Sequence, residues 1–164
     1  MFIADTKHIG ITEDKIRSEI GMRFLTDPHF KVYVNNKPVI FNDIQSDQAS
    51  ELLFEFKGIP VRIRVIHTIK SDKTSQQHGV AWHVQNRLVG QCNWDGLRND
   101  NILDGRTSMA KKYTFIVQAD AIAPYVKADW SGFENDSELL EFYDLTKSTI
   151  LQFISELSKE KRAE

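Results

Sequence analysis

The sequence is poor in several features that would narrow the class of protein. Cys92 is the only cysteine, so the chain cannot form an internal disulfide. There is no secretory signal and no apolar run near the ~20 residues that a membrane helix requires, so we expect a cytoplasmic protein without a membrane partner. The net charge of −2 predicts no overall attraction to nucleic acid, and phosphate binding would have to use a local basic patch.

Complete catalytic and metal-binding motifs are also missing. No two histidines stand four residues apart on a predicted helix, and there is no nucleophile elbow and no P-loop. His67 and His83 could face each other across neighbouring strands, although surface or edge positions are the ordinary outcome for such histidines. Asp95, Asp100 and Asp104 lack the ligand spacing of a calcium loop, so we expect solvated acids and predict no metal site.

Turn residues and apolar periodicity predict the elements. Thr12 is placed to cap a first helix, which the pair Asp27-Pro28 would end. Three hairpins are expected around Asn35-Asn36, Lys57-Gly58 and Gln85-Asn86, because residues that tolerate positive φ stand there between strand-like runs. A long loop over 94–109, a strand over 113–117 and a helix from Asp136 or Ser137 to about Lys161 complete the chain.

This order predicts an α+β fold with a mostly antiparallel sheet of hairpins and a long C-terminal helix packed on one face. In strand 61–65 the alternation of apolar and basic residues indicates one buried face and one wet face. The apolar stripe of the last helix is expected to pack on the sheet, although a heptad-like seam could instead pair two chains into a homodimer. The stripe consists of Leu139, Phe142, Tyr143, Thr146, Ile150, Phe153, Ile154 and Leu157.

Basic residues give the more suggestive pattern. Side chains of this type neutralise the phosphates of nucleic acid or a nucleotide, or simply keep a sheet face in contact with water. The candidates on strand 61–65 and around the long loop are Arg62, Arg64, Arg98, Arg106, Lys111 and Lys112. A further cation, Lys127, lies among apolar and aromatic residues in the irregular stretch 123–130 before the last helix, where we expect it to be held more firmly than a surface lysine.

Three segments, in this order, resemble the second domain of the GHKL ATPase superfamily. They are residues 23–28 with 30–35 (RFLTDP and FKVYVN), residues 79–89 (GVAWHVQNRLV), and residues 115–120 with 124–133 (FIVQAD and PYVKADWSGF). The superfamily includes gyrase, the MutL mismatch-repair proteins and the MORC proteins, and the likeness is greatest to bacterial ATP-binding proteins of the MORC or MutL type. The second segment resembles a hairpin of the family with an N-x-R-x-V-like turn.

The resemblance implies a transducer domain with a ribosomal-protein-like β-α-β fold and a left-handed crossover. Residues 1–25 would be the tail and connecting helix of a preceding ATP-binding domain, and residues 26–164 the transducer itself. In gyrase-like and MutL-like members a lysine of this domain reaches the γ-phosphate of ATP bound with Mg in the first domain, and Lys127 matches that lysine by position. Such a cation would stabilise the charge that develops on the transferring phosphoryl group.

The sequence also departs from the superfamily. Its ATP site needs an Asn- and Glu-bearing helix, a D-x-G-x-G turn and a Gly-rich lid, and Lys7 and Ile9 stand where the turn would need glycines. The apolar start at residues 1–4 reads as the middle of a longer protein. We therefore expect a piece of an ATPase that neither binds ATP tightly nor hydrolyses it alone.

Two other readings stay open. The chain could be a free-standing nucleic-acid or protein-binding module that uses the basic residues, with DNA as a partner and Trp82, Trp94 or Trp130 as a stacking platform for bases, although Trp82 at least is expected in the core. It could also be a small enzyme with a site built from Cys92, His83 and the loop from Asp95 to Asp104.

Overall fold

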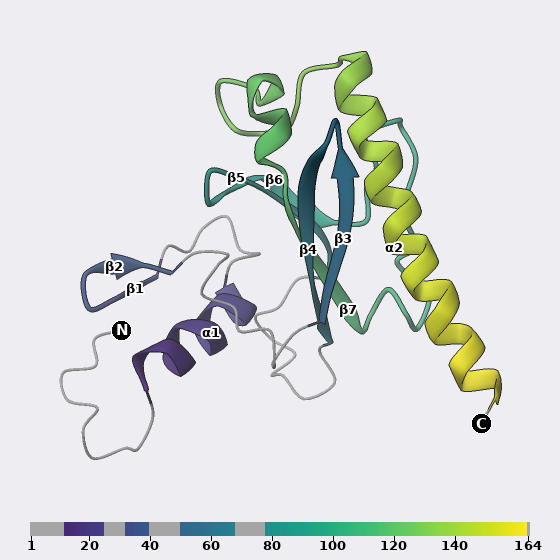
Figure 1. Cartoon of the computed structure of the whole chain (residues 1–164), viewed down its shortest axis with the longest axis horizontal. Coiled ribbons are helices and arrows are strands. Elements are labelled where there is room, and N and C mark those ends of the chain that lie inside the picture. Colours follow the sequence, from purple (N-terminus) through teal and green to yellow (C-terminus); the bar gives the residue numbers. More distant parts are fainter. Residues whose placement is uncertain (1–11, 25–31, 40–49, 68–77, 164) are drawn as a thin grey trace.

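The computed structural model describes residues 12–24, 32–39, 50–67 and 78–163 (Figure 1). Two predictions fall outside these ranges: the tail of an ATP-binding domain at residues 1–11 and the helix stop at residues 27–28. Within the described residues, no helix combines the length and apolar character needed to cross a membrane.

The first helix and first hairpin form as predicted. Helix α1 spans Glu13–Phe24, and the hydroxyl oxygen of Thr12 accepts a hydrogen bond from the Lys15 N–H at 3.3 Å, which confirms the cap. Strands β1 (Tyr33–Val34) and β2 (Lys37–Pro38) flank a turn in which both asparagines have positive φ, 51° and 66°. These are the values that a two-residue hairpin turn requires.

Arg17 ties this helix to the hairpin. Its side chain is buried, and its guanidinium donates to carbonyl oxygens of the hairpin, namely those of Val34 (2.7 Å), Lys37 (3.1 Å) and Pro38 (3.0 Å). These bonds cross the domain boundary predicted after residue 25, so α1 and the hairpin form one local unit.

The main sheet has five strands. They are β3 (Ser50–Phe56), β4 (Ile59–His67), β5 (Gly79–Val84), β6 (Arg87–Asn93) and β7 (Tyr113–Gln118), in the spatial order β3-β4-β7-β5-β6. All neighbours are antiparallel except β5 and β7, which run parallel. The second and third hairpins turn at positive φ as predicted, and the α+β class with a mostly antiparallel sheet is confirmed.

Helix α2 (Ser137–Ala163) covers one face of this sheet (Figure 1). The Asp136 carboxylate accepts a hydrogen bond from the Glu138 N–H at 2.9 Å and caps the helix as predicted. The ring of Phe142 lies 5.6 and 5.2 Å from the rings of Phe54 and Phe56 on β3. The first part of the predicted stripe therefore packs into the core of its own sheet, with five members buried: Leu139, Phe142, Tyr143, Thr146 and Ile150.

The opposite face of the sheet is buried around Arg64, although Arg62 on the same face is part-exposed, which corrects the expectation of a wet face on β4 for Arg64. Arg64 is only 4% exposed, and it shares that face with the buried residues Ile66, Ile116 and Cys92. Alternation along a strand reveals which residues share a face, but it does not reveal whether a basic face meets water. In this case a carboxylate on the neighbouring strand pairs with Arg64 inside the protein.

The connection between the two parallel strands contains β6 and the loop 94–112, and no helix. A β-α-β unit of the kind implied by the resemblance is thus not present in the described residues. The loop is long, as predicted, and it is anchored to the core: Trp94 and Ile102 are buried, and the Trp94 indole N–H donates to the carbonyl of Ala110 at 3.1 Å. After β7 come the 3₁₀ helix η2 (Asp120–Tyr125) and the turn that leads into α2.

Candidate phosphate-binding site

Lys127 lies in a tight turn between η2 and α2. The Lys127 N–H donates to the carbonyl of Gly132 at 2.9 Å, and the Lys127 carbonyl accepts from the Trp130 N–H at 2.9 Å. A bridge between Val126 and Phe133 closes the turn. The side chain of Lys127 is exposed, and its ammonium forms no ion pair with any described residue. A defined backbone therefore presents a cation to solvent.

The β5–β6 hairpin supports this turn. The Gly90 N–H donates to the Trp130 carbonyl at 2.8 Å, and the guanidinium carbon of Arg87 lies 4.4 Å from the centre of the Trp130 ring. Gly90 has φ of 68°, and a Cβ there would lie 3.1 Å from the Ser131 carbonyl oxygen, so glycine permits the close approach. The hairpin and the lysine turn thus form one unit although they are distant in the sequence.

The end of β7 joins the same unit. The Ala119 N–H donates to the His83 carbonyl at 2.7 Å, and the Gln85 N–H donates to the Asp120 carboxylate at 2.6 Å. The second and third segments on which the resemblance depends therefore meet at one end of the sheet. The turn between Gln85 and Arg87 lies next to η2 and to the Lys127 turn.

Glu138 fixes the start of α2 to this end of the sheet. Its two carboxylate oxygens accept hydrogen bonds from the Lys57 ammonium and from the Tyr125 hydroxyl. These bonds lower the pKa of Glu138, with that from Lys57 acting most strongly, and the bond to Glu138 is the main cause that raises the pKa of Tyr125 to about 12.

The predicted basic residues on β4 both pair with one acid, Glu51. The Glu51 carboxylate accepts two hydrogen bonds from Arg62, at 2.9 and 3.2 Å, and its second oxygen lies 2.7 Å from Nη1 of Arg64. The Arg62 hydrogen bonds are the main cause that lowers the pKa of Glu51. Burial lowers the pKa of the Arg64 guanidinium. A phosphate at this site would have to displace Glu51 from both arginines.

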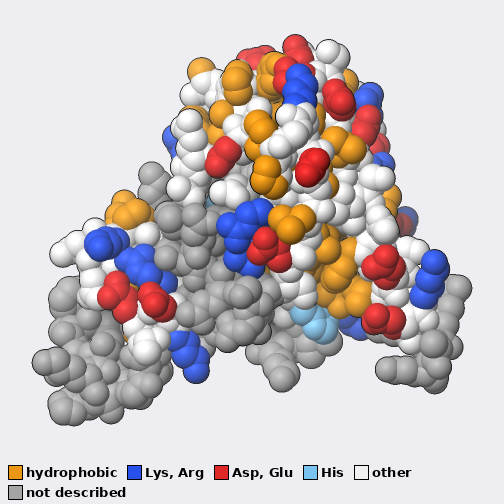
Figure 2. Space-filling model, viewed as in Figure 1, with side chains coloured by type: hydrophobic (Ala, Val, Ile, Leu, Met, Phe, Trp, Pro, Cys, Tyr) orange, Lys and Arg blue, Asp and Glu red, His pale blue; other side chains and the backbone are white. Residues whose placement is uncertain are grey.

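The basic residues around the loop 94–112 are also dispersed. Arg98 forms a two-bond pair with Asp144 of α2 at 2.8 and 2.7 Å, and Arg106 pairs with Asp104, whose pKa falls to about 2 chiefly because of the Arg106 hydrogen bonds. Lys111 is exposed and belongs to neither pair. In Figure 2, the basic side chains of the visible face gather in small, separate groups with acidic side chains beside them. The local basic patch considered from the sequence is therefore not assembled on this face.

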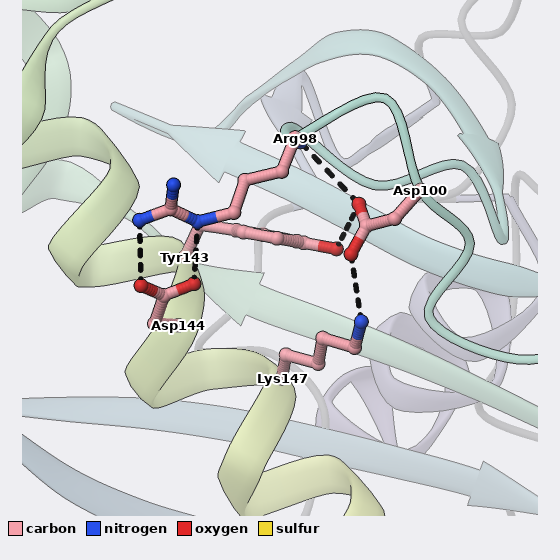
Figure 3. Close-up of polar contacts among 5 residues, drawn as sticks. All are labelled: Arg98, Asp100, Tyr143, Asp144 and Lys147. Carbon is pink, nitrogen blue, oxygen red and sulfur yellow. Dashed lines mark hydrogen bonds and ion pairs between the residues drawn. The ribbon is translucent and has the colours of Figure 1, made fainter.

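Asp100 is not a solvated loop acid, which corrects another expectation. Its carboxylate accepts hydrogen bonds from the hydroxyl of Tyr143 and the ammonium of Lys147, both at 2.7 Å, and so links the loop to α2 (Figure 3). Burial alone would raise the pKa of Asp100, but the bonds from Lys147, Tyr143 and the Arg98 backbone together lower it. Burial and the bond to Asp100 raise the pKa of Tyr143.

The structure does not support a catalytic cysteine. Cys92 is buried on the face opposite α2, and burial raises its thiol pKa to about 12, so the nucleophilic thiolate is not populated near neutral pH. His67 and His83 do not meet, because β7 separates their strands and pairs them with Tyr113 and Gln118 at its two ends. No cluster of potential metal ligands occurs among the described residues.

Comparison with known proteins adds no identification: no family model matches the chain, and no curated protein matches its sequence. The candidate site therefore depends on its own geometry. Sequence reasoning placed Lys127 in it but did not include Arg87 or Trp130 as partners. The N-x-R-x-V-like turn drew attention to the hairpin, and no signal in the sequence shows that its arginine lies on a tryptophan of a later segment.

Proposed function

We propose that this chain is the transducer domain of a cytoplasmic GHKL-type ATPase. Lys127 contacts the γ-phosphate of ATP that is bound, with Mg, by a separate N-terminal domain. The observation that supports this proposal best is the exposed Lys127 ammonium on a hydrogen-bonded turn, where it forms no ion pair with a described residue although Asp129 lies in the same turn. A lysine at such a place acts as a point charge toward a phosphate.

The contact would stabilise negative charge on the transferring phosphoryl group. It would also give the nucleotide a way to influence α2. Beyond the turn, the Glu134 N–H donates to the Tyr125 carbonyl at 2.6 Å, and Asp136 caps the helix three residues before Leu139 enters the core. A displacement of the Lys127 turn would therefore reach the start of a helix whose first half packs on the sheet.

The test is ATP turnover in a protein that joins this chain to its N-terminal ATP-binding domain. Lys127→Ala is expected to lower turnover by about 100-fold, the usual effect of removing one donor to developing charge, while nucleotide binding is largely retained. Lys111→Ala is the matched control, because it removes the same charge from another exposed position. The chain alone should show no ATPase activity, and wild-type turnover in Lys127→Ala would remove the proposed role.

A further inference from the structure

Arg87 differs from the other arginines whose side chains the structure describes. Each of the others is engaged by oxygen acceptors: Arg17 by backbone carbonyls and Glu13, Arg62 and Arg64 by Glu51, Arg98 by Asp144, and Arg106 by Asp104. Arg87 is exposed, and no described carboxylate or carbonyl accepts a hydrogen bond from it. Its described contact is with the face of the Trp130 ring, at 4.4 Å.

Stacking on an indole prepares a guanidinium for an anion. The ring holds the plane of the guanidinium by a cation–π interaction, and the N–H donors at its edges remain directed outward. This fork of donors matches two oxygens of a phosphate group. Because the side chain is already ordered, less rotamer entropy is lost when a ligand binds.

The position of Trp130 relates Arg87 to Lys127. The Trp130 N–H donates to the Lys127 carbonyl, and the Trp130 carbonyl accepts from Gly90 on the same strand as Arg87. Two cations from different elements are thus carried by one hydrogen-bonded unit. Asp129 in the same turn directs its carboxylate at the N–H and hydroxyl of Ser131, at 3.1 and 2.6 Å. The hydrogen bonds from Ser131 and, more weakly, the charge of Lys127 lower the pKa of Asp129, so this acid offsets part of the positive charge of the unit.

We propose that Arg87 is a second phosphate-contacting residue that acts together with Lys127 on the triphosphate of a nucleotide, with Trp130 as the residue that positions its guanidinium. This inference depends on the proposed function, since it concerns the same ligand. It adds a contact from the β5–β6 hairpin, so the nucleotide would draw on both the hairpin and the turn before α2. Loss of Trp130 would leave the charge of Arg87 in place but free its side chain to move.

Tripolyphosphate titrated into the 164-residue chain at low salt tests this inference. The readout is the NMR shift of the Arg87 Nε–H and the Trp130 indole N–H, which report the stacked pair directly. We expect saturable shifts of both signals in the wild type and a loss of affinity of at least tenfold in Arg87→Ala and in Lys127→Ala. Arg87→Lys keeps the charge without the planar fork and is expected to fall between Arg87→Ala and the wild type. Arg106→Ala, which removes a 91% exposed arginine side chain, should bind as the wild type does.

Four outcomes would overturn the inference, and they separate it from the proposed function. If Lys127→Ala loses affinity while Arg87→Ala binds normally, Arg87 has no role and the function proposed for Lys127 stands. If the wild type does not bind, or if Arg106→Ala weakens binding as much as Arg87→Ala, there is no specific site at the stacked pair. Tighter binding of a single-stranded oligonucleotide than of tripolyphosphate, abolished by Arg87→Ala, would assign the pair to nucleic acid instead.

Discussion

Gly79 shows how the approach of two strands constrains a single residue. Its φ is 140°, and a Cβ at this position would lie 2.3 Å from the Asn93 carbonyl carbon on β6. Gly79→Ala therefore combines a conformation closed to other residues with a backbone clash, and we expect it to lower the free energy of unfolding by about 2 kcal/mol or more. Gly132→Ala is the control, because no atom lies within 4 Å of its added Cβ, and its effect should stay within about 0.5 kcal/mol. Urea denaturation followed by circular dichroism measures the free energy of unfolding of both variants. Equal losses would contradict the claim that the close approach of β5 and β6 requires glycine at position 79.

Arg64 marks the limit of prediction for single residues. Alternation along β4 correctly put Arg62 and Arg64 on one face, because side chains of a strand point to opposite faces in turn. Whether that face is buried depends on Glu51, which belongs to the neighbouring strand and pairs with both arginines. Arg87 and Trp130 present the same difficulty, since a contact between distant segments leaves no local pattern.

Between elements, the Asp100 network decides how the loop 94–112 is held on α2. Asp100→Ala would leave the hydroxyl of the fully buried Tyr143 without its acceptor, so we expect a loss of about 1–3 kcal/mol in the free energy of unfolding at neutral pH. Asp144→Ala is the control, because it changes an acid of α2 that pairs with the loop residue Arg98 at the surface. It should lower the free energy of unfolding by less than about 1 kcal/mol. Similar losses in the two variants would show that the buried hydroxyl does not matter.

The contribution of Asp100 to the free energy of unfolding depends on pH. Because the folded-state pKa of Asp100 is lowered, its stabilising effect is complete above the unfolded-state value of about 3.9 and is lost as the pH falls through the folded-state value. The difference in free energy of unfolding between the wild type and Asp100→Ala should therefore narrow below about pH 4. Denaturation curves from pH 7 to pH 3 measure it.

Helices and strands could be predicted where the residues of the element itself determine its structure. The three hairpins follow from residues that accept positive φ between strand-like runs, and α2 follows from its cap and stripe. The segment 94–109 was predicted only as a loop, because its order comes from Trp94 and Asp100, which contact segments far along the chain. The parallel pairing of β5 with β7 also has no local signal, since both strands are apolar runs that would suit either direction.

At the scale of the whole molecule, Cys92 reports on global unfolding. It lies in the buried cluster on the face opposite α2, and its thiol pKa is about 12. We expect a thiol-reactive dye at about pH 8 to label the folded chain very slowly, and the rate to rise with urea in parallel with the loss of circular dichroism. Rapid stoichiometric labelling without urea would mean that this face opens while the rest of the fold persists.

The strand order has a consequence for synthesis on the ribosome. β7 bonds to β4 on one side and to β5 on the other, yet it is the last of the five strands in the sequence. The β3–β4 and β5–β6 hairpins therefore leave the ribosome before the strand that unites them exists. Until residue 118 has emerged, the inner edges of both hairpins offer unpaired backbone groups to any neighbouring chain, and that interval is when a nascent polypeptide of this topology most needs a chaperone.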